Sequence, residues 1–259
     1  MLRNISIAVI VLPLLVSPPV VAELTNNPLL GAGVEIQPAY DGSRNDIAYP
    51  VPLIRYLGQR WFIRDTQDIL EGGFRYALLP GLYLGGQLAY EPGRLTYQSN
   101  LLQRYQIPGI APSLSWGAHL EWDTHLGPAP INILLRDRQR TDRINGNLFD
   151  ARISVGILDY HHLGLALFTQ NTWANQTYNR GFYGVSSLSA NQTGLTPYQP
   201  GSGLVFNTLG IMGGYSFNSH WGVFGSLEHR RFSALVKDSP IVDAGSARYI
   251  NLSLIYQFP

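Results

Sequence analysis

The residues best suited to chemistry are His119, Glu121 and Asp123, which alternate with apolar residues in the segment 113–123. One imidazole and two carboxylates could hold a metal ion, or could act as a base with an orienting acid. On an extended strand, residues two apart share a face and lie roughly 6–7 Å from each other. That spacing favours a hydrated polar cluster over a metal site. We therefore expect no metal, no cofactor and no catalytic residue here.

Further ionisable residues occupy alternate positions in other extended segments, and both signs of charge are present. Arginine suits enclosed ion pairs because its guanidinium bonds carboxylates through two parallel hydrogen bonds and is weakly hydrated. The predicted lumen network consists of Glu35, Arg64, Glu71, Arg75, Glu91, His119, Glu121, Asp123, Arg136, Arg138, Arg152, Glu228 and Arg230. Such a network could fill a narrow barrel as a plug, which we favour, or could line a small polar pore or solute site.

Strands with two unlike faces must position these residues. In the segment 113–123, Leu114, Trp116 and Trp122 share one face, while the ionisable residues share the other. A row of ionisable groups would be costly in a dry core, so this second face requires water or counter-charges. The same period of two recurs in twelve segments: 30–37, 49–56, 60–65, 70–78, 82–91, 113–123, 131–138, 151–157, 163–173, 207–217, 221–232 and 250–258.

The connections between these segments are alternately short and longer, except for a short one near 66–69. Short periplasmic turns and longer external loops are typical of outer-membrane barrels, which have an even number of antiparallel strands. The sequence thus predicts an all-β transmembrane antiparallel barrel of about 12 strands, with both termini on the periplasmic side. A soluble β-sandwich or lipocalin-like barrel also alternates, but the length of this array and its charged inner face count against it.

Composition narrows the function classes. Only 14% of the 259 residues are charged, and the formal net charge of +1 gives no reason to expect nucleic-acid binding. With no Cys, the chain has neither disulfides nor a thiol nucleophile. Residues 1–22 read as a cleaved secretory signal, because Arg3 precedes the apolar run 5–16. We expect the mature barrel to comprise residues 23–259.

Motifs in the C-terminal third resemble those of one protein family. They are Tyr178-Asn-Arg-Gly-Phe-Tyr-Gly184, Gly194-Leu-Thr-Pro-Tyr198, Gly214-Tyr-Ser-Phe217, His220-Trp221 and Asp238-Ser-Pro-Ile-Val242. Their order and spacing resemble the MipA/OmpV family of outer-membrane proteins. Near the start, Pro38-Ala-Tyr-Asp-Gly-Ser43, Pro50-Val-Pro-Leu53 and Trp61-Phe62 are similar to the family's N-terminal pattern. The resemblance spans about residues 30–258, and the chain departs from it by ending on Pro259 after Phe258.

The resemblance implies a monomeric outer-membrane barrel, in contact with lipid, that acts as a scaffold. Its partners would be a murein lytic transglycosylase and a murein synthase, which is a bifunctional penicillin-binding protein, so the role would lie in peptidoglycan assembly. Other family members resemble surface antigens, adhesion barrels or permeability factors. The competing hypotheses are a small-solute permeability channel or a surface antigen or adhesion barrel, and, from another class, an envelope hydrolase. The family offers no catalytic residues to carry over.

Overall fold

The structure is a computed structural model that describes residues 28–67 and 69–258. The predicted signal segment 1–22 and Pro259 lie outside the described residues. The strands are β1 (Leu29–Pro38), β2 (Asp46–Leu57), β3 (Trp61–Thr66), β4 (Ile69–Leu79), β5 (Leu82–Glu91), β6 (Ser113–Leu126), β7 (Ala129–Arg140), β8 (Asn147–Tyr160), β9 (Leu163–Ala174), β10 (Gly203–Ser216), β11 (Trp221–Phe232) and β12 (Ser246–Gln257). Short helices occupy the longer connections: η1 (Thr96–Gln98), α1 (Asn100–Arg104), α2 (Gln176–Tyr183), α3 (Ser187–Thr193) and α4 (Ala234–Lys237).

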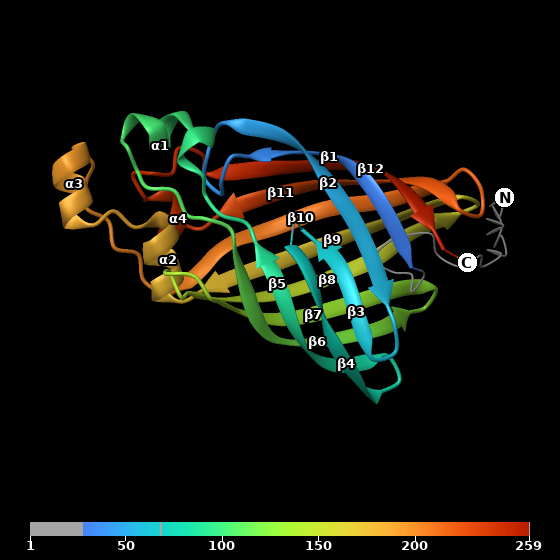
Figure 1. The fold of residues 1–259 in the computed structure, drawn as a ribbon. Helices are drawn as coiled ribbons and strands as arrows, with labels where there is room; N and C mark the ends of the chain where they lie inside the picture. The colour runs from blue at the N-terminus through green and yellow to red at the C-terminus, as the bar shows by residue number, and fades with distance from the viewer. Residues whose placement is uncertain (1–27, 68, 259) are drawn as a thin grey trace, which may run out of the picture.

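The twelve strands form one closed antiparallel barrel, in which each strand pairs with its neighbours in sequence and β1 pairs with β12 (Figure 1). This confirms the predicted fold class and strand number. Closure sets Leu29 opposite Gln257, so the described chain starts and finishes at the end of the barrel that carries the short turns. Several strands run beyond their predicted limits; β8, for example, begins at Asn147 instead of 151.

The period of two separates the barrel wall into an apolar outside and a polar inside. Outward side chains such as Leu88, Leu209 and Leu252 are each more than 60% exposed in the isolated chain. A band of this kind is stable only against hydrocarbon, which is why outer-membrane barrels carry it. Among the described residues, no helix is long and apolar enough to cross a membrane.

Turn geometry keeps the short-turn end compact. The β4–β5 turn contains Pro80 and Gly81, and Gly81 has a φ of +77°. Glycine adopts positive φ without the steric penalty that a Cβ imposes, so a tight turn can form here.

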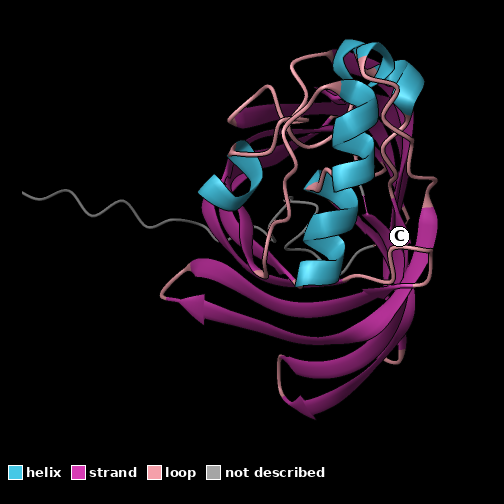
Figure 2. Cartoon of the chain, turned by 90° about the vertical axis from the view of Figure 1, so that its left-hand side faces the viewer, coloured by secondary structure: helices cyan, strands magenta, loops and turns pink. Residues whose placement is uncertain are grey.

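The longer connections fold over the opposite end. Figure 2 views the molecule from this side and shows the helices in front of the barrel opening. Helix α2 packs Tyr178, Phe182 and Tyr183 into a buried cluster with strand residues such as Phe206 and Phe232. A second cluster joins the β1–β2 connection, α1, α3 and the segment before β12. The sequence predicts longer external loops at this end, and the short helices within them are a finding of the structure.

Candidate functional site

The inward faces of the strands carry all of the sequence-predicted lumen residues. Asp123 is half-buried. The others are at most 8% exposed: Glu35, Arg64, Glu71, Arg75, Glu91, His119, Glu121, Arg136, Arg138, Arg152, Glu228 and Arg230. Charges enclosed to this degree are tolerated only when they are paired and hydrogen-bonded. The contacts among them therefore decide what the lumen can do.

The centre of the lumen is built on Asp150 of β8. One oxygen of its carboxylate lies 2.9 Å from Nη2 of Arg136 and 3.0 Å from Nη2 of Arg138. The other oxygen accepts hydrogen bonds from Thr172 at 2.8 Å and from Gln170 at 3.3 Å. Register explains the first contact, because Arg136 and Asp150 stand directly opposite each other on β7 and β8.

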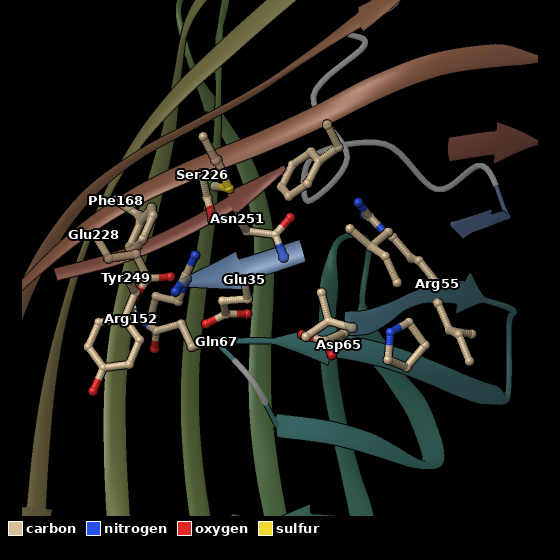
Figure 3. A pocket seen from close by; sticks show the side chains of 16 residues that line it. Glu35, Arg55, Asp65, Gln67, Arg152, Phe168, Ser226, Glu228, Tyr249 and Asn251 are labelled. Carbon is tan, nitrogen blue, oxygen red and sulfur yellow. Dashed lines mark hydrogen bonds between the residues drawn. The ribbon is translucent and has the colours of Figure 1, made fainter. Parts of the chain in front are cut away.

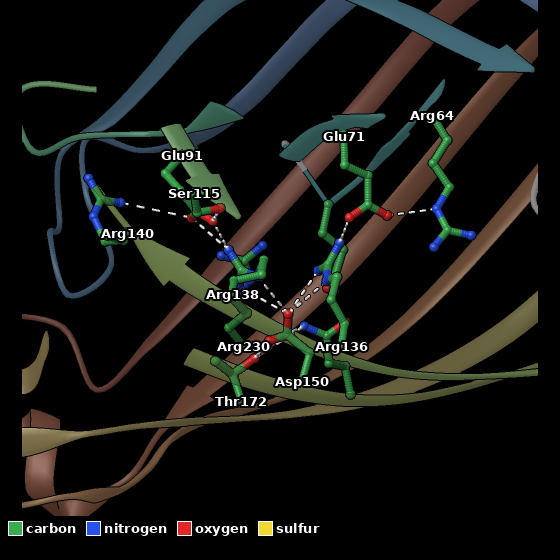
Figure 4. Close-up of polar contacts among 12 residues, drawn as sticks. Arg64, Glu71, Glu91, Ser115, Arg136, Arg138, Arg140, Asp150, Thr172 and Arg230 are labelled. Atoms are coloured by element: carbon green, nitrogen blue, oxygen red, sulfur yellow. Dashed lines mark hydrogen bonds and ion pairs between the residues drawn. The ribbon is translucent and has the colours of Figure 1, made fainter. Parts of the chain in front are cut away.

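From this centre, ion pairs extend towards both ends of the lumen (Figure 4). Arg136 reaches Glu71 at 2.9 Å, and Glu71 in turn lies 2.6 Å from Arg64. In the other direction Arg138 lies 2.6 Å from Glu91. The sign of the charge alternates at every step of the chain Arg64, Glu71, Arg136, Asp150, Arg138, Glu91, Arg140 and Asp142. We call this set of residues the ion-pair chain.

A branch of the network surrounds His119. Glu121 lies 2.9 Å from Arg64 and 4.0 Å from Arg75. Asn132 donates hydrogen bonds to Glu121 at 2.9 Å and to Asp123 at 2.8 Å, which joins these two carboxylates.

His119 itself sits edge-on to the Phe62 ring, with ring centroids 4.9 Å apart. Within residues 28–67 and 69–258, neither ring nitrogen of His119 has a hydrogen-bond partner. In the same residues, no three His, Asp or Glu side chains form a group that could hold a metal ion.

The remaining predicted residues make further contacts. Arg230 of β11 lies 3.3 Å from Asp41 and 3.7 Å from Glu228, with its guanidinium 3.8 Å from the centre of the Tyr249 ring. Arg152 lies with its guanidinium 3.8 Å from the centre of the Phe168 ring. Together with Glu35 it lines a cavity of about 70 Å³ (Figure 3).

Sequence reasoning missed several members of this lumen: Asp41, Arg55, Asp65, Arg140 and Asp150. Asp150 could have been found, because it continues the alternation of Arg152 and Ser154 by one more step. Arg55 likewise lies in a predicted strand, directly opposite Arg64 in the β2–β3 register. Asp41 lies in a connection, where no periodic signal exists.

The longer connections and their helices, which cover the end of the barrel opposite the short turns, are called the cap. One buried tyrosine links two loops of this cap. The hydroxyl of Tyr40 donates a hydrogen bond to the backbone oxygen of Ile241 at 2.5 Å. Burial, together with the nearby carboxylate of Asp243, raises the pKa of Tyr40 to about 12. The β1–β2 connection is thereby tied to the segment that leads into β12.

The fold and the lumen define a small outer-membrane β-barrel whose interior is largely filled by its own charged side chains. A family model described as "MltA-interacting protein MipA" matches residues 30–258, and the chain belongs to that family. It is 26% identical to the MltA-interacting proteins of Escherichia coli (strain K12) and of Shigella flexneri. Both matches extend over 245 residues and cover 88% of this chain and 89% of the relative. Family and barrel together place the protein in the outer membrane.

Solved structures of similar shape are distant in sequence. An outer-membrane channel from Pseudomonas putida F1 has a TM-score of 0.48 and 10% identity, with 94% of this chain and 100% of the channel covered. A bacterial polysaccharide outer membrane secretin has a TM-score of 0.44 and 8% identity, with 90% and 99% covered.

Proposed function

We propose that this barrel is a scaffold of peptidoglycan assembly that joins a murein lytic transglycosylase to a bifunctional penicillin-binding protein, and that it is not an enzyme. The observation that carries the proposal is the ion-pair chain, which runs through the lumen from Arg64 to Asp142. A lumen occupied by paired charges, with only small cavities left, favours a role performed at the surface of the barrel. The relatives' name, MltA-interacting protein, supports a transglycosylase as the partner.

The short-turn end offers a surface for such partners. Turns of a few residues are too small for a large interface, so the strand ends must contribute. Leu79, Leu126 and Tyr160 stand at the β4–β5, β6–β7 and β8–β9 turns and are 63%, 74% and 62% exposed. Exposed apolar groups gathered at the rim of a barrel suit protein contact. We place the docking surface for the murein enzymes on these three turns.

Co-purification from cross-linked envelopes tests this function. The wild-type barrel should recover a lytic transglycosylase and a penicillin-binding protein. A Leu79→Glu and Leu126→Glu double variant should lose at least tenfold of both, because charge is introduced into an apolar contact. Phe217→Glu is the matched control, since Phe217 is 55% exposed beside the β10–β11 turn on another part of the same rim. If the wild-type barrel recovers no murein enzyme, the scaffold proposal is wrong.

A permeability role is the second candidate, and three small cavities favour it. Their volumes are about 100, 70 and 30 Å³. The first two share Gln67 and Tyr249 in their linings, and the last two share Arg55, Asp65 and Arg152, so the cavities follow one another along the lumen.

Conductance in planar bilayers separates the two candidates. Discrete steps from the wild-type barrel would support a channel. We expect no conductance steps from the wild-type barrel. We also expect no steps from the Arg136→Ala and Arg138→Ala double variant, because the cap still covers one end. Co-purification and conductance are independent measurements, so each candidate can fail alone.

A further inference from the structure

Basic side chains gather on the outer surface of β11 and β12, which lie side by side in the barrel wall (Figure 1). His229 and Arg231 of β11 and Arg248 of β12 are exposed, whereas Glu228 and Arg230, which alternate with the first two, are buried in the lumen. His229 stands directly opposite Arg248 in the register, so their Cα atoms lie about 5 Å apart. Arg231 follows His229 by two residues, or roughly 6–7 Å along the strand. We call His229, Arg231 and Arg248 the basic patch.

The protein supplies no counter-charge to the basic patch. Among residues 28–67 and 69–258, no carboxylate forms an ion pair with any of its side chains. The carboxylates of Glu228 and Asp41 face inward, where both pair with Arg230. Asp46, an exposed carboxylate, lies on β2, which β1 separates from β12. The guanidinium donors of the basic patch are therefore available to a bound anion.

The basic patch marks one edge of the apolar band. Towards the short turns, the next outward residues on the same two strands are Leu227 and Ile250, which stand opposite each other and are exposed. Towards the cap, the residues opposite Arg231 are polar, namely Ser246 and Asn207. Outer-membrane barrels carry their short turns in the periplasm and their longer loops outside. The basic patch thus lies at the level of the lipid head groups of the outer leaflet.

An apolar groove lies on the same outer face, beside the basic patch and nearer to the short turns. Its volume is about 380 Å³, and Ile211, Val223 and Leu227 contribute to its lining. The groove is hollow where Gly213 of β10 and Gly225 of β11 stand opposite each other without side chains. A Cβ on Gly225 would have no atom nearer than 3.4 Å, so there is open space at this point. Along β11, the groove begins at Leu227, two residues from the basic patch.

We propose that one phosphate-bearing lipid of the outer leaflet binds here, with its phosphate on the basic patch and an acyl chain in the groove. Arg231 and Arg248 suit a phosphate in particular, because a guanidinium bonds phosphate oxygens through two parallel hydrogen bonds. The acyl chain would gain van der Waals contacts in the space that the glycine pair leaves open. This site lies on the outer face near the cap, whereas the proposed docking surface for the murein enzymes lies on the short turns, so the two proposals are independent.

Native mass spectrometry with lipid A, a phosphorylated glycolipid, tests the site on the whole barrel folded in an uncharged detergent. We expect the wild type to retain lipid A, and we expect lipid A without its phosphates to bind at least tenfold more weakly. Inorganic phosphate at the same concentration should not displace lipid A, because it has no acyl chain. Equal affinities for the two forms of the lipid, or displacement by inorganic phosphate, would overturn the proposal.

A charge-removing variant tests the head-group contact. Arg231→Gln combined with Arg248→Gln should lower the affinity for lipid A at least tenfold. Arg104→Gln combined with Arg143→Gln is the matched control, because both of these arginines are exposed in the cap and the same charge is lost. The control should bind lipid A as the wild type does. Wild-type affinity in a folded Arg231→Gln and Arg248→Gln barrel would contradict the proposal.

A groove-filling variant tests the acyl-chain contact. Gly225→Phe places a ring in the groove and should lower the affinity for lipid A at least fivefold. Leu88→Phe is its control, because Leu88 is 61% exposed on the outer surface of β5, away from the groove. That control should leave the affinity unchanged. If a folded Gly225→Phe barrel binds lipid A as tightly as the wild type, the acyl chain does not occupy the groove and the proposal is wrong. If Gly225→Phe does not fold, the arginine variants decide the question alone.

Discussion

At the scale of the single residue, the carboxylate of Asp150 joins four other lumen side chains of the described part of the chain. Two arginines and two neutral side chains donate hydrogen bonds to its carboxylate, and its side chain is fully buried. Arginine remains protonated under all ordinary conditions, so both guanidinium groups need a nearby negative charge. Removing one partner of a buried ion pair is costly because the other charge stays enclosed without compensation.

We therefore expect Asp150→Asn, which keeps the shape and removes the charge, to lower the free energy of unfolding by about 3–5 kcal/mol. Urea unfolding in lipid vesicles, followed by tryptophan fluorescence, measures this change. Asp46→Asn is the control, since Asp46 is exposed at the start of β2 and its replacement should stay within about 0.5 kcal/mol. Equal stabilities of the two variants would contradict the structural role of Asp150.

Tyr40 gives a residue-scale prediction in pH. Its pKa is raised from 10 to about 12, chiefly by burial, so the folded state resists its deprotonation. The stability that Tyr40 contributes is fully present below pH 10 and is lost as the pH rises towards 12. Tyrosinate absorbance should show a titration near pH 12 that is missing in Tyr40→Phe. A Tyr40 titration centred near pH 10 in the folded barrel would contradict its burial.

At the scale of the element, close contact between strands limits which residues fit. A Cβ on Gly117 of β6 would lie 1.8 Å from the backbone oxygen of Asp137 on β7. By contrast, a Cβ on Gly225 of β11 would have no atom nearer than 3.4 Å. Both residues lie within long strands, so they form a matched pair.

We expect Gly117→Ala to destabilise the barrel by about 1–3 kcal/mol, because β6 and β7 must separate locally to admit the methyl group. Gly225→Ala should change the free energy of unfolding by less than about 0.5 kcal/mol. The same urea titration measures both variants. A Gly117→Ala barrel as stable as the wild type would show that the two strands can move apart without loss.

At the scale of the whole molecule, closure of the sheet satisfies the backbone groups of nearly every strand. A closed wall offers no free edge for association. We expect the barrel in detergent to have the mass of one chain by light scattering. A mass of two chains would contradict this expectation.

The strand count and the two faces of the wall could be predicted because they follow from local alternation. The segment 113–123 shows this clearly, since His119 and Glu121 are buried while Leu114 and Trp116 are exposed. Pro50 and Pro52 did not prevent strand formation, since both lie within β2 and in its ladder with β1. The helices of the cap were not predicted, because each is too short to show a sustained helical period of apolar residues.

By itself, the sequence determined that this protein is a barrel with a charged interior, because the alternating direction of side chains is a property of every extended chain. Only the tertiary structure decided which charges meet. Glu91 and Arg138 are 47 residues apart, and Arg64 and Glu121 are 57 apart, yet each pair is in contact. Such pairs depend on how strands are staggered around the closed barrel, and stagger is a property of the whole sheet.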